Sequence, residues 1–253
     1  MAVSLRNIRC VVAYDGTEFL GFQRQAGGQT VQGVLEDAVA SLTGEQVRVL
    51  GAGRTDAGVH AAGQVVAFRT ASRIPVERWP YALNSRLPPS VVVTDAAEAP
   101  AQFHPRRDAV AKVYQYTIWN GRFPSPFWSR WALHVPTPLD VEAMAQAAAM
   151  LVGRHDFAAF RAAGSTPVKS TVRHLMNLAV ERCPREPECV RIVARADGFL
   201  YHMVRNIAGT LLVVGQGRRP PGWVAEVLAG RRREAAGPTA PAHGLCLVRV
   251  EYG

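Results

Sequence analysis

The chain opens with two segments whose apolar residues recur at different periods. Apolar and polar positions alternate along residues 7–14, which is typical of a strand with one buried face, and Asp15-Gly16 predicts the turn that ends it. After Thr30 the spacing changes to three and four residues, which predicts a helix that Thr30 caps and Gly44 ends. Its apolar face would consist of Val31, Val34, Leu35, Ala38, Val39 and Leu42.

Shorter apolar segments complete the first part of the chain. Residues 47–50 and 64–68 predict two strands on either side of a glycine-rich loop. A short helix is expected to end within residues 81–89, and the three valines at 91–93 predict a buried strand. The charged segment from Gln102 to Arg107 is a plausible boundary, so we expect one domain over residues 1–105 and a second over residues 106–253.

The second part again begins with a strand and continues with a helix. A strand is predicted over residues 112–119, and Asp140 is expected to cap a helix that Gly153 ends. The remaining elements are a hairpin of residues 175–181 and 190–195, a helix over residues 199–214, a short helix from Pro220 to Gly230 and a last strand over residues 245–250. This mixture favours an α+β fold over a regular parallel sheet.

A proline-containing loop after the strand at 112–119 is rich in aromatic residues. It carries Phe123, Phe127, Trp128 and Trp131. We expect these rings to pack in the protein interior, and stacking on RNA bases is the alternative.

The balance of charge favours a polyanionic partner. Lysine and arginine together number 29 against 20 acidic residues, a formal net charge of +9, and only Lys112 and Lys169 are lysines. Arginine offers a planar fork for phosphate and a flat face for stacking on bases, so nucleic acid is the partner we expect. A basic surface that merely keeps the protein in solution, with part of the arginine bias reflecting genome composition, is the alternative.

Several classes of protein are disfavoured by the sequence. No apolar run reaches the length of about 18 residues that a membrane span needs, and the first ten residues contain no long apolar segment, so we expect a cytoplasmic protein without a membrane anchor. The four cysteines and seven histidines show no spacing typical of a metal site. Cys183 and Cys189 could face each other across the predicted hairpin, but we do not expect a structural disulfide.

The stretch from Gly51 to His60 is the strongest candidate for chemistry. It holds one carboxylate, Asp56, between the cations Arg54 and His60, and its glycines suit a backbone that something must approach closely. An aspartate flanked in this way would stay ionised, as a nucleophile or base requires. A glycine-rich hairpin in which Asp56 only makes an Asx turn is the alternative.

These segments together closely resemble the tRNA pseudouridine synthase A family over nearly the whole chain. The matching pieces are Tyr14-Asp15-Gly16-Thr17, Gly21-Phe22-Gln23-Arg24-Gln25, Thr30-Val31-Gln32, the run from Gly53 to Ala61, Leu83-Asn84, Leu87-Pro88, Phe103-His104, Tyr114-Gln115-Tyr116, His155-Asp156-Phe157, Phe160-Arg161, the run from His202 to Ile207, and Gly244-Leu245. The chain departs from the family pattern at Phe22, Pro105 and Val113, which affects expected RNA contacts and leaves the pocket residues untouched.

The resemblance implies a fold of two similar halves, with largely antiparallel sheets joined across a central basic cleft, and a homodimer. It also implies that uridine is isomerised to pseudouridine at positions 38, 39 and 40 of the tRNA anticodon stem-loop, without a cofactor or a metal. By motif position, Asp56 would be the catalytic aspartate, Tyr114 the ring against the target uracil, Arg205 the partner of Asp56 and Leu245 an apolar wall. Arg54 would hold the flipped nucleotide, and the further RNA contacts would be Arg24, Lys112 and His202.

The residues alone leave alternatives open. Without the resemblance, we would expect Tyr114 to be a core residue and Arg205 to be a solvated charge on a helix. A tRNA-binding protein without chemistry would use the same basic surface, and a hydrolase would use Asp56 with His60. For the isomerase, Asp56 could attack C1′ or C6 of the nucleotide or remove a ribose proton.

Overall fold

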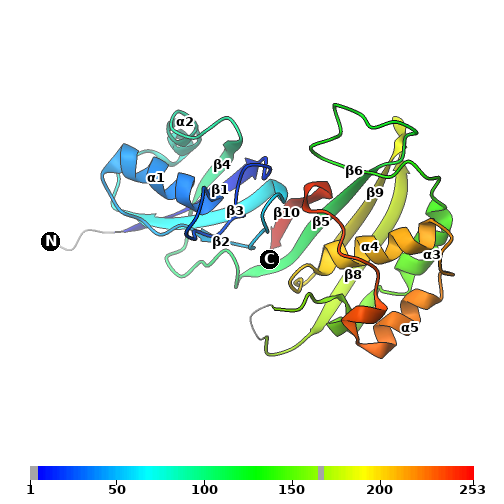
Figure 1. Ribbon diagram of the computed structural model, residues 1–253. Coiled ribbons are helices and arrows are strands. Elements are labelled where there is room, and N and C mark those ends of the chain that lie inside the picture. The colour runs from blue at the N-terminus through cyan, green and yellow to red at the C-terminus, as the bar shows by residue number, and fades with distance from the viewer. Residues whose placement is uncertain (1–4, 165–167) are drawn as a thin grey trace. The chain divides into compact units, whose positions relative to one another are not determined.

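The computed structural model describes residues 5–164 and 168–253, which form two compact units. Of these residues, the first unit contains 5–110 together with 246–253, and the second contains 111–164 together with 168–245. Both units combine helices with strands that pair mostly in the antiparallel sense, which confirms the α+β prediction (Figure 1). Within the described residues, no helix is both long enough and apolar enough to cross a bilayer.

The first unit is built on a sheet in the order β4 (Val91–Ala99), β1 (Arg6–Tyr14), β3 (His60–Thr70) and β10 (Leu245–Tyr252). β1 runs antiparallel to both neighbours, and the short β2 (Leu50–Gly51) adds to β3. β10 pairs in parallel with the first residues of β3, with Cys246 opposite His60. β10 therefore adds a strand to the sheet that carries the glycine-rich loop.

Local signals in the sequence account for α1 (Val31–Thr43) in this unit. The Thr30 side chain accepts a hydrogen bond from the Gly33 amide, and Gly44 ends the helix in the left-handed conformation, at φ 75°. Both predicted caps are confirmed. The second helix, α2 (Trp79–Asn84), follows the 3₁₀ turn η1 (Val76–Arg78) and is anchored by Trp79, whose ring meets Phe68 of β3 edge to face at 5.2 Å.

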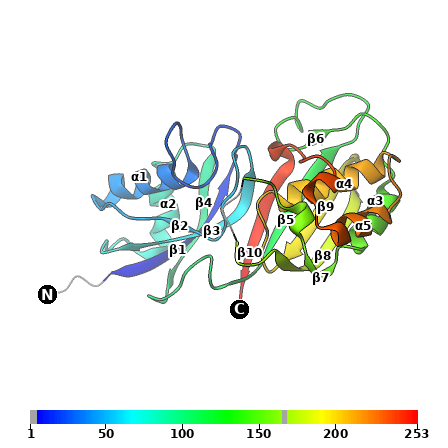
Figure 2. The same cartoon turned by 60° about the horizontal axis from the view of Figure 1, so that its bottom comes forward.

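In the second unit the strands lie in the order β5 (Ala109–Trp119), β9 (Glu186–Ala196), β8 (Val172–Cys183) and β7 (Gly153–Asp156), and β6 (Leu133–His134) adds to β5. Three helices lie together against this sheet (Figures 1 and 2): α3 (Val141–Ala149), α4 (Met203–Gly215) and α5 (Trp223–Gly230). The short 3₁₀ turns of the unit are η2 (Ala158–Phe160), η3 (Arg233–Ala235) and η4 (Ala242–Gly244). The predicted cap of α3 is confirmed, since Asp140 accepts from the Ala143 amide at 2.8 Å.

Several predicted boundaries are wrong, for identifiable reasons. Residues 47–49 form no strand, because the Val49 amide donates to the Glu36 carboxylate of α1 instead of to a strand partner. α3 stops at Ala149, and Gly153 begins β7 at φ 122° rather than ending the helix. The helix expected from residue 199 starts only at Met203, because His202 adopts the left-handed conformation, at φ 59°.

The hairpin of β8 and β9 is longer than predicted, and only Pro184 and Arg185 lie between its strands. Cys183 and Cys189 do face each other: both are buried free thiols, and their Sγ atoms are 2.8 Å apart. Burial raises the pKa of Cys189 to about 12. The Cys189 thiol is therefore protonated at neutral pH, and both buried cysteines form part of the packing of this hairpin.

Candidate active site

Asp56 lies in the loop that joins β2 to β3 of the first unit. Gly53 and Thr55 are buried, whereas Arg54 is exposed and Asp56 is partly exposed, so alternate residues face the interior and the solvent. The Val59 amide donates to the Asp56 carbonyl at 3.1 Å, which turns the chain back into β3. The two charged residues are thus presented outward from a backbone that is held from within.

A buried polar cluster holds this backbone. The Gln64 side chain of β3 donates from Nε2 to the Gly53 carbonyl at 2.9 Å and accepts at Oε1 from the Gly53 amide at 3.2 Å. Nε2 also reaches the Tyr14 hydroxyl at 3.4 Å, and that hydroxyl shares a 2.8 Å hydrogen bond with Thr55 Oγ1. Burial raises the pKa of Tyr14 to about 12, so its hydroxyl is neutral at physiological pH. Because both neighbours of Arg54 are tied to the interior, the loop has little freedom to shift.

Two glycines let other segments approach the loop closely. A Cβ on Gly21 would lie 2.6 Å from the Thr55 carbonyl oxygen, and the next residue, Phe22, donates its amide to that oxygen at 3.0 Å. A Cβ on Gly16 would lie 2.1 Å from the Val59 carbonyl oxygen. The segments Tyr14–Thr17 and Gly21–Gln25, which the sequence shows only as motifs, therefore form the support of the Asp56 loop.

The buried His60 at the start of β3 has a structural role in this arrangement. Its Nδ1 accepts a hydrogen bond from the Gly16 amide at 3.0 Å and lies 3.2 Å from Asp15 Oδ1. His60 joins the turn after β1 to the end of the Asp56 loop.

The second unit contains the other predicted pocket residues. Tyr114 of β5 is buried and meets Phe199 edge to face, with ring centroids 5.0 Å apart. Tyr116 lies two residues further along β5, and its hydroxyl donates to the Pro241 carbonyl at 2.9 Å. A Cβ on Gly244 would lie 2.6 Å from the Tyr116 ring. Tyr116 therefore fixes the segment that ends in the buried Leu245.

Arg205 lies in the first turn of α4 and is tied to the same segment. Its Nε donates to the Ala240 carbonyl at 2.8 Å, and the Ala240 amide donates to the Arg205 carbonyl at 3.1 Å. Burial raises the pKa of Tyr116, and the nearby charge of Arg205 partly opposes this rise. Within the second unit, residues 240–245 thus link Arg205, Tyr116 and Leu245.

Close backbone contact holds the preceding residues, 237–239, on α4. A Cβ on Gly209 would lie 1.7 Å from the Pro238 carbonyl oxygen, so only glycine fits this face of the helix. The Gly237 amide donates to Thr210 Oγ1 at 3.0 Å, and the buried Asn206 accepts from Thr239 Oγ1 at 2.6 Å. The helix and the segment are fixed to each other by these bonds.

His202 and Lys112, two of the predicted RNA contacts, are both half-buried in the second unit. The His202 ring stacks on Tyr201 with centroids 3.8 Å apart, at the left-handed residue that precedes α4. A non-glycine residue in this conformation costs about 1–3 kcal/mol, and such residues cluster at functional sites. Lys112 lies on β5, two residues before Tyr114.

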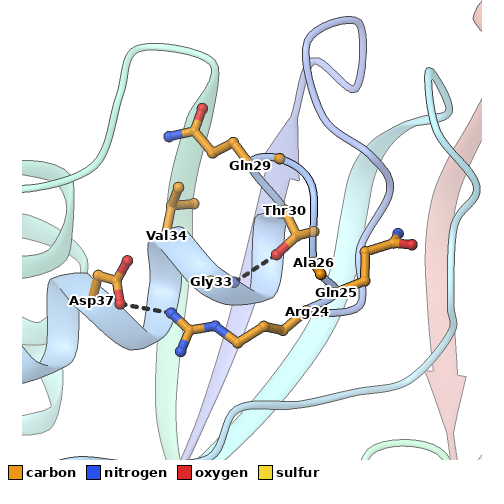
Figure 3. A pocket seen from close by; sticks show the side chains of 9 residues that line it. Arg24, Gln25, Ala26, Gln29, Thr30, Gly33, Val34 and Asp37 are labelled. Atoms are coloured by element: carbon orange, nitrogen blue, oxygen red, sulfur yellow. Dashed lines mark hydrogen bonds and ion pairs between the residues drawn. The ribbon is translucent and has the colours of Figure 1, made fainter.

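Arg24, the third predicted RNA contact, lines a hollow of about 560 Å³ beside α1 (Figure 3). Its guanidinium extends along the helix, with Nη2 2.8 Å from Asp37 Oδ1 and Nε 3.4 Å from Glu36 Oε2. A phosphate would have to compete with these two carboxylates for Arg24. The contact between Arg24 and RNA stays a prediction.

The predicted site residues fall into two sets. Asp56, Arg54 and Arg24 belong to the first unit, and Tyr114, Lys112, Arg205, His202 and Leu245 belong to the second. The assignment of Arg205 and Tyr114 as neighbours of Asp56 joins residues of different units and stays a prediction. Among residues 5–164 and 168–253, His, Cys, Asp and Glu side chains form no group of three or more that could hold a metal ion.

Sequence reasoning missed the residues that hold the site together. Gln64, Tyr14 and Thr55 support the Asp56 loop, and Tyr116 supports the segment before Leu245. The sequence does mark Gln64 as unusual, since it is the one side-chain amide within the apolar run from Ala61 to Phe68. A polar side chain at such a position must find buried partners.

Comparisons with known proteins identify the family of this chain. The family model described as tRNA pseudouridine synthase matches residues 10–108 and 147–253. A protein of Brevibacillus brevis named tRNA pseudouridine synthase A is 50% identical over 248 residues, covering 98% of this chain and 100% of the relative. Proteins of the same name from Moorella thermoacetica and Myxococcus xanthus are 50% and 49% identical, cover 97% of this chain, and are themselves covered over 99% and 91% of their lengths. The chain therefore belongs to the tRNA pseudouridine synthase family.

Proposed function

We propose that this protein is a tRNA pseudouridine synthase that isomerises uridine at positions 38, 39 and 40 of the anticodon stem-loop. The observation that carries the proposal is identity of about 50% over nearly the whole chain to proteins named tRNA pseudouridine synthase A. The buried support of the Asp56 loop adds to it, because such a support holds one carboxylate in a defined position. The net charge of +9 suits a polyanionic substrate.

The reaction cuts the N1–C1′ bond of uridine, rotates the uracil and rejoins it to the ribose through C5. Reactant and product have the same atoms and the same oxidation state, so side chains can carry out the whole change. Asp56 acts as nucleophile on C1′ or C6, or as the base that removes a ribose proton. Its partial exposure leaves room for a nucleotide to reach it.

The remaining site residues bind and orient the nucleotide. Arg205 pairs with Asp56 as the cation beside the carboxylate. The target base must leave its stack at a cost of a few kcal/mol, and stacking on Tyr114 returns about 1–3 kcal/mol. Leu245 covers the other face of the base, and Arg54 holds the flipped nucleotide. Arg24, Lys112 and His202 contact the RNA around it.

Two further properties belong to the proposal because the family resemblance implies them. The protein acts in the cytoplasm, and it works as a homodimer that binds one tRNA across both subunits. Sedimentation of the protein with and without tRNA measures the stoichiometry directly.

Substitution of Asp56 tests the proposal. Asp56→Ala and Asp56→Asn should abolish pseudouridine formation in a tRNA transcript while leaving the Kd for tRNA within a few-fold of the parent value. Asp95→Ala is the matched control, since Asp95 is an exposed aspartate on β4 of the same unit. Pseudouridine is quantified by nucleoside analysis after digestion, and its positions are mapped by chemical probing and primer extension.

Three outcomes would overturn the proposal. Full activity of Asp56→Ala would remove Asp56 from the catalytic role. A parent protein that binds tRNA but makes no pseudouridine would be a binding protein, as the main alternative holds. Release of free uracil or of cleaved strands would identify the hydrolase that pairs Asp56 with His60, an alternative that gains no support from the structural role of His60 beside Gly16.

A further inference from the structure

The loop between β5 and β6 presents aromatic side chains to the solvent. Phe123 is 70% exposed, Phe127 is 86% exposed and Trp131 is 40% exposed, which contradicts the expectation that these rings pack in the interior. We call residues 120–132 the aromatic loop. It extends away from the sheet of the second unit in both views (Figures 1 and 2). Exposed rings of this size cost solvation free energy, so their presence on one loop calls for a function.

The aromatic loop is ordered by its own hydrogen bonds and ring contacts. Trp119 Nε1 donates to the Phe123 carbonyl at 2.9 Å, and the Trp119 ring stacks on Trp128 with centroids 6.2 Å apart and planes 17° from parallel. The Asn120 side chain donates to the carbonyls of Val135 and Thr137, both at 2.8 Å. One set of aromatic rings therefore fixes the loop, while Phe123 and Phe127 are left on its surface.

The charge of this region selects the kind of partner. The chain contains no aspartate or glutamate between Asp108 and Asp140, whereas Arg122 and Arg130 lie exposed in the aromatic loop. The Arg122 guanidinium lies 5.2 Å from the centre of the Phe123 ring. Flat rings interleaved with guanidinium groups suit nucleobases and phosphates together, because every base has a face to stack and each nucleotide carries a negative charge.

We propose that the aromatic loop is a stacking surface for unpaired nucleotides of an RNA, with Phe123 and Phe127 under the bases and Arg122 beside a phosphate. The inference deepens the proposed function, on which it rests for the identity of the RNA as tRNA. The aromatic loop contains none of the residues assigned to catalysis. It increases affinity for RNA that displays unstacked bases and plays no part in breaking the glycosidic bond.

Binding measurements on exposed-ring variants test the inference. The double variant Phe123→Ser, Phe127→Ser should bind a labelled ten-nucleotide single-stranded RNA of mixed sequence about 10- to 100-fold more weakly in a fluorescence anisotropy titration. Tyr81→Ser is the matched control, since Tyr81 is a 73% exposed ring on α2 of the first unit and should not change the affinity. Phe127→Trp keeps a stacking face, so it should retain affinity within about threefold.

Salt dependence separates the two kinds of contact. The double variant removes no charge, so it should leave the slope of log K against log salt unchanged, whereas Arg122→Gln should make that slope shallower by about 0.7 to 1. Unchanged affinity of the double variant, or an equal loss in Tyr81→Ser, would overturn the inference. So would a change in oligomeric state, seen by sedimentation, at unaltered RNA affinity, because the loop would then be a contact between protein chains.

The measured quantity is binding of RNA to protein whose catalytic residues are intact. If Asp56→Ala retains activity, the assignment of catalysis fails while these binding results stand. If the double variant binds as tightly as the parent, the stacking surface fails while the assignment of Asp56 stands.

Discussion

The side-chain amide of Gln64 pairs with the backbone amide of Gly53, donating to its carbonyl at 2.9 Å and accepting from its N–H at 3.2 Å. Gly53 is three residues before Asp56, and Gln64 lies within β3, so the pair joins the candidate catalytic loop to the interior of the sheet. Two consequences follow, one for stability and one for activity.

Gln64→Leu should lower the free energy of unfolding by about 2–4 kcal/mol, because it leaves the Gly53 N–H and C=O buried without partners. In assays run well below the melting temperature of the variant, the kcat for pseudouridine formation should fall at least tenfold. The KM for tRNA should change less than threefold. Gln64→Glu, which keeps an acceptor but loses the donor, should show the same sign. Gln46→Leu, at an exposed glutamine, serves as the control. A loss of stability with unchanged kcat would mean that the pair supports the fold and not the site.

Tyr14→Phe should remove the 2.8 Å hydrogen bond to Thr55 at a cost of about 1 kcal/mol in stability. It should also change the alkaline pH dependence. The pKa of Tyr14 is raised from 10 to about 12 by burial, so the folded state holds this proton more tightly than the unfolded state does. The free energy of unfolding that this difference in pKa contributes is fully present below pH 10. It is lost as the pH rises to 12, and the loss is at most about 1.4 kcal/mol per pH unit. Denaturant melts between pH 9 and 12 should therefore show a shallower decline for Tyr14→Phe than for the parent.

Gly16→Ala should destabilise the protein and displace the Asp56 loop, because the new Cβ would lie 2.1 Å from the Val59 carbonyl oxygen, which is backbone and has little room to yield. We expect a loss of about 2 kcal/mol or more and a marked fall in kcat. Gly222→Ala is the control, since a Cβ there has nothing within 4 Å and its φ of −60° suits alanine. Thermal melts and single-turnover rates measure both effects. Equal behaviour of the two variants would contradict the close packing at Gly16.

Asp37→Asn should strengthen tRNA binding by a few-fold at low salt if Arg24 contacts phosphate, because it frees Nη2 from a carboxylate 2.8 Å away. Removal of any negative charge from a basic protein raises affinity slightly, so Asp95→Asn, at an exposed aspartate on β4, sets the baseline. The difference between the two variants in a filter-binding titration is the informative quantity. A difference of zero would count against Arg24 as an RNA contact.

Much of the local structure could be predicted because it depends on neighbours along the chain. The caps at Thr30 and Asp140 are hydrogen bonds to amides three residues ahead, and the strand at residues 7–14 follows from alternation alone. Predictions failed where a side chain from another element, or an unusual backbone conformation, intervened. The Glu36 carboxylate takes the Val49 amide away from a strand, and the left-handed His202 delays the start of α4.

The sequence by itself determined the family, the class of fold and the identity of the candidate catalytic aspartate, because these depend on residue types in a fixed order. Only the tertiary structure decided how the Asp56 loop is held and which aromatic rings face the solvent. Gln64 meets Gly53 across 11 positions and Tyr14 meets Thr55 across 41, so their contact depends on the register between strands. Phe127 and Tyr116 are both aromatic residues in one stretch of chain, yet one is exposed and the other fully buried. Burial is set by what packs against a side chain from elsewhere in the fold, and the residue type alone does not carry that information.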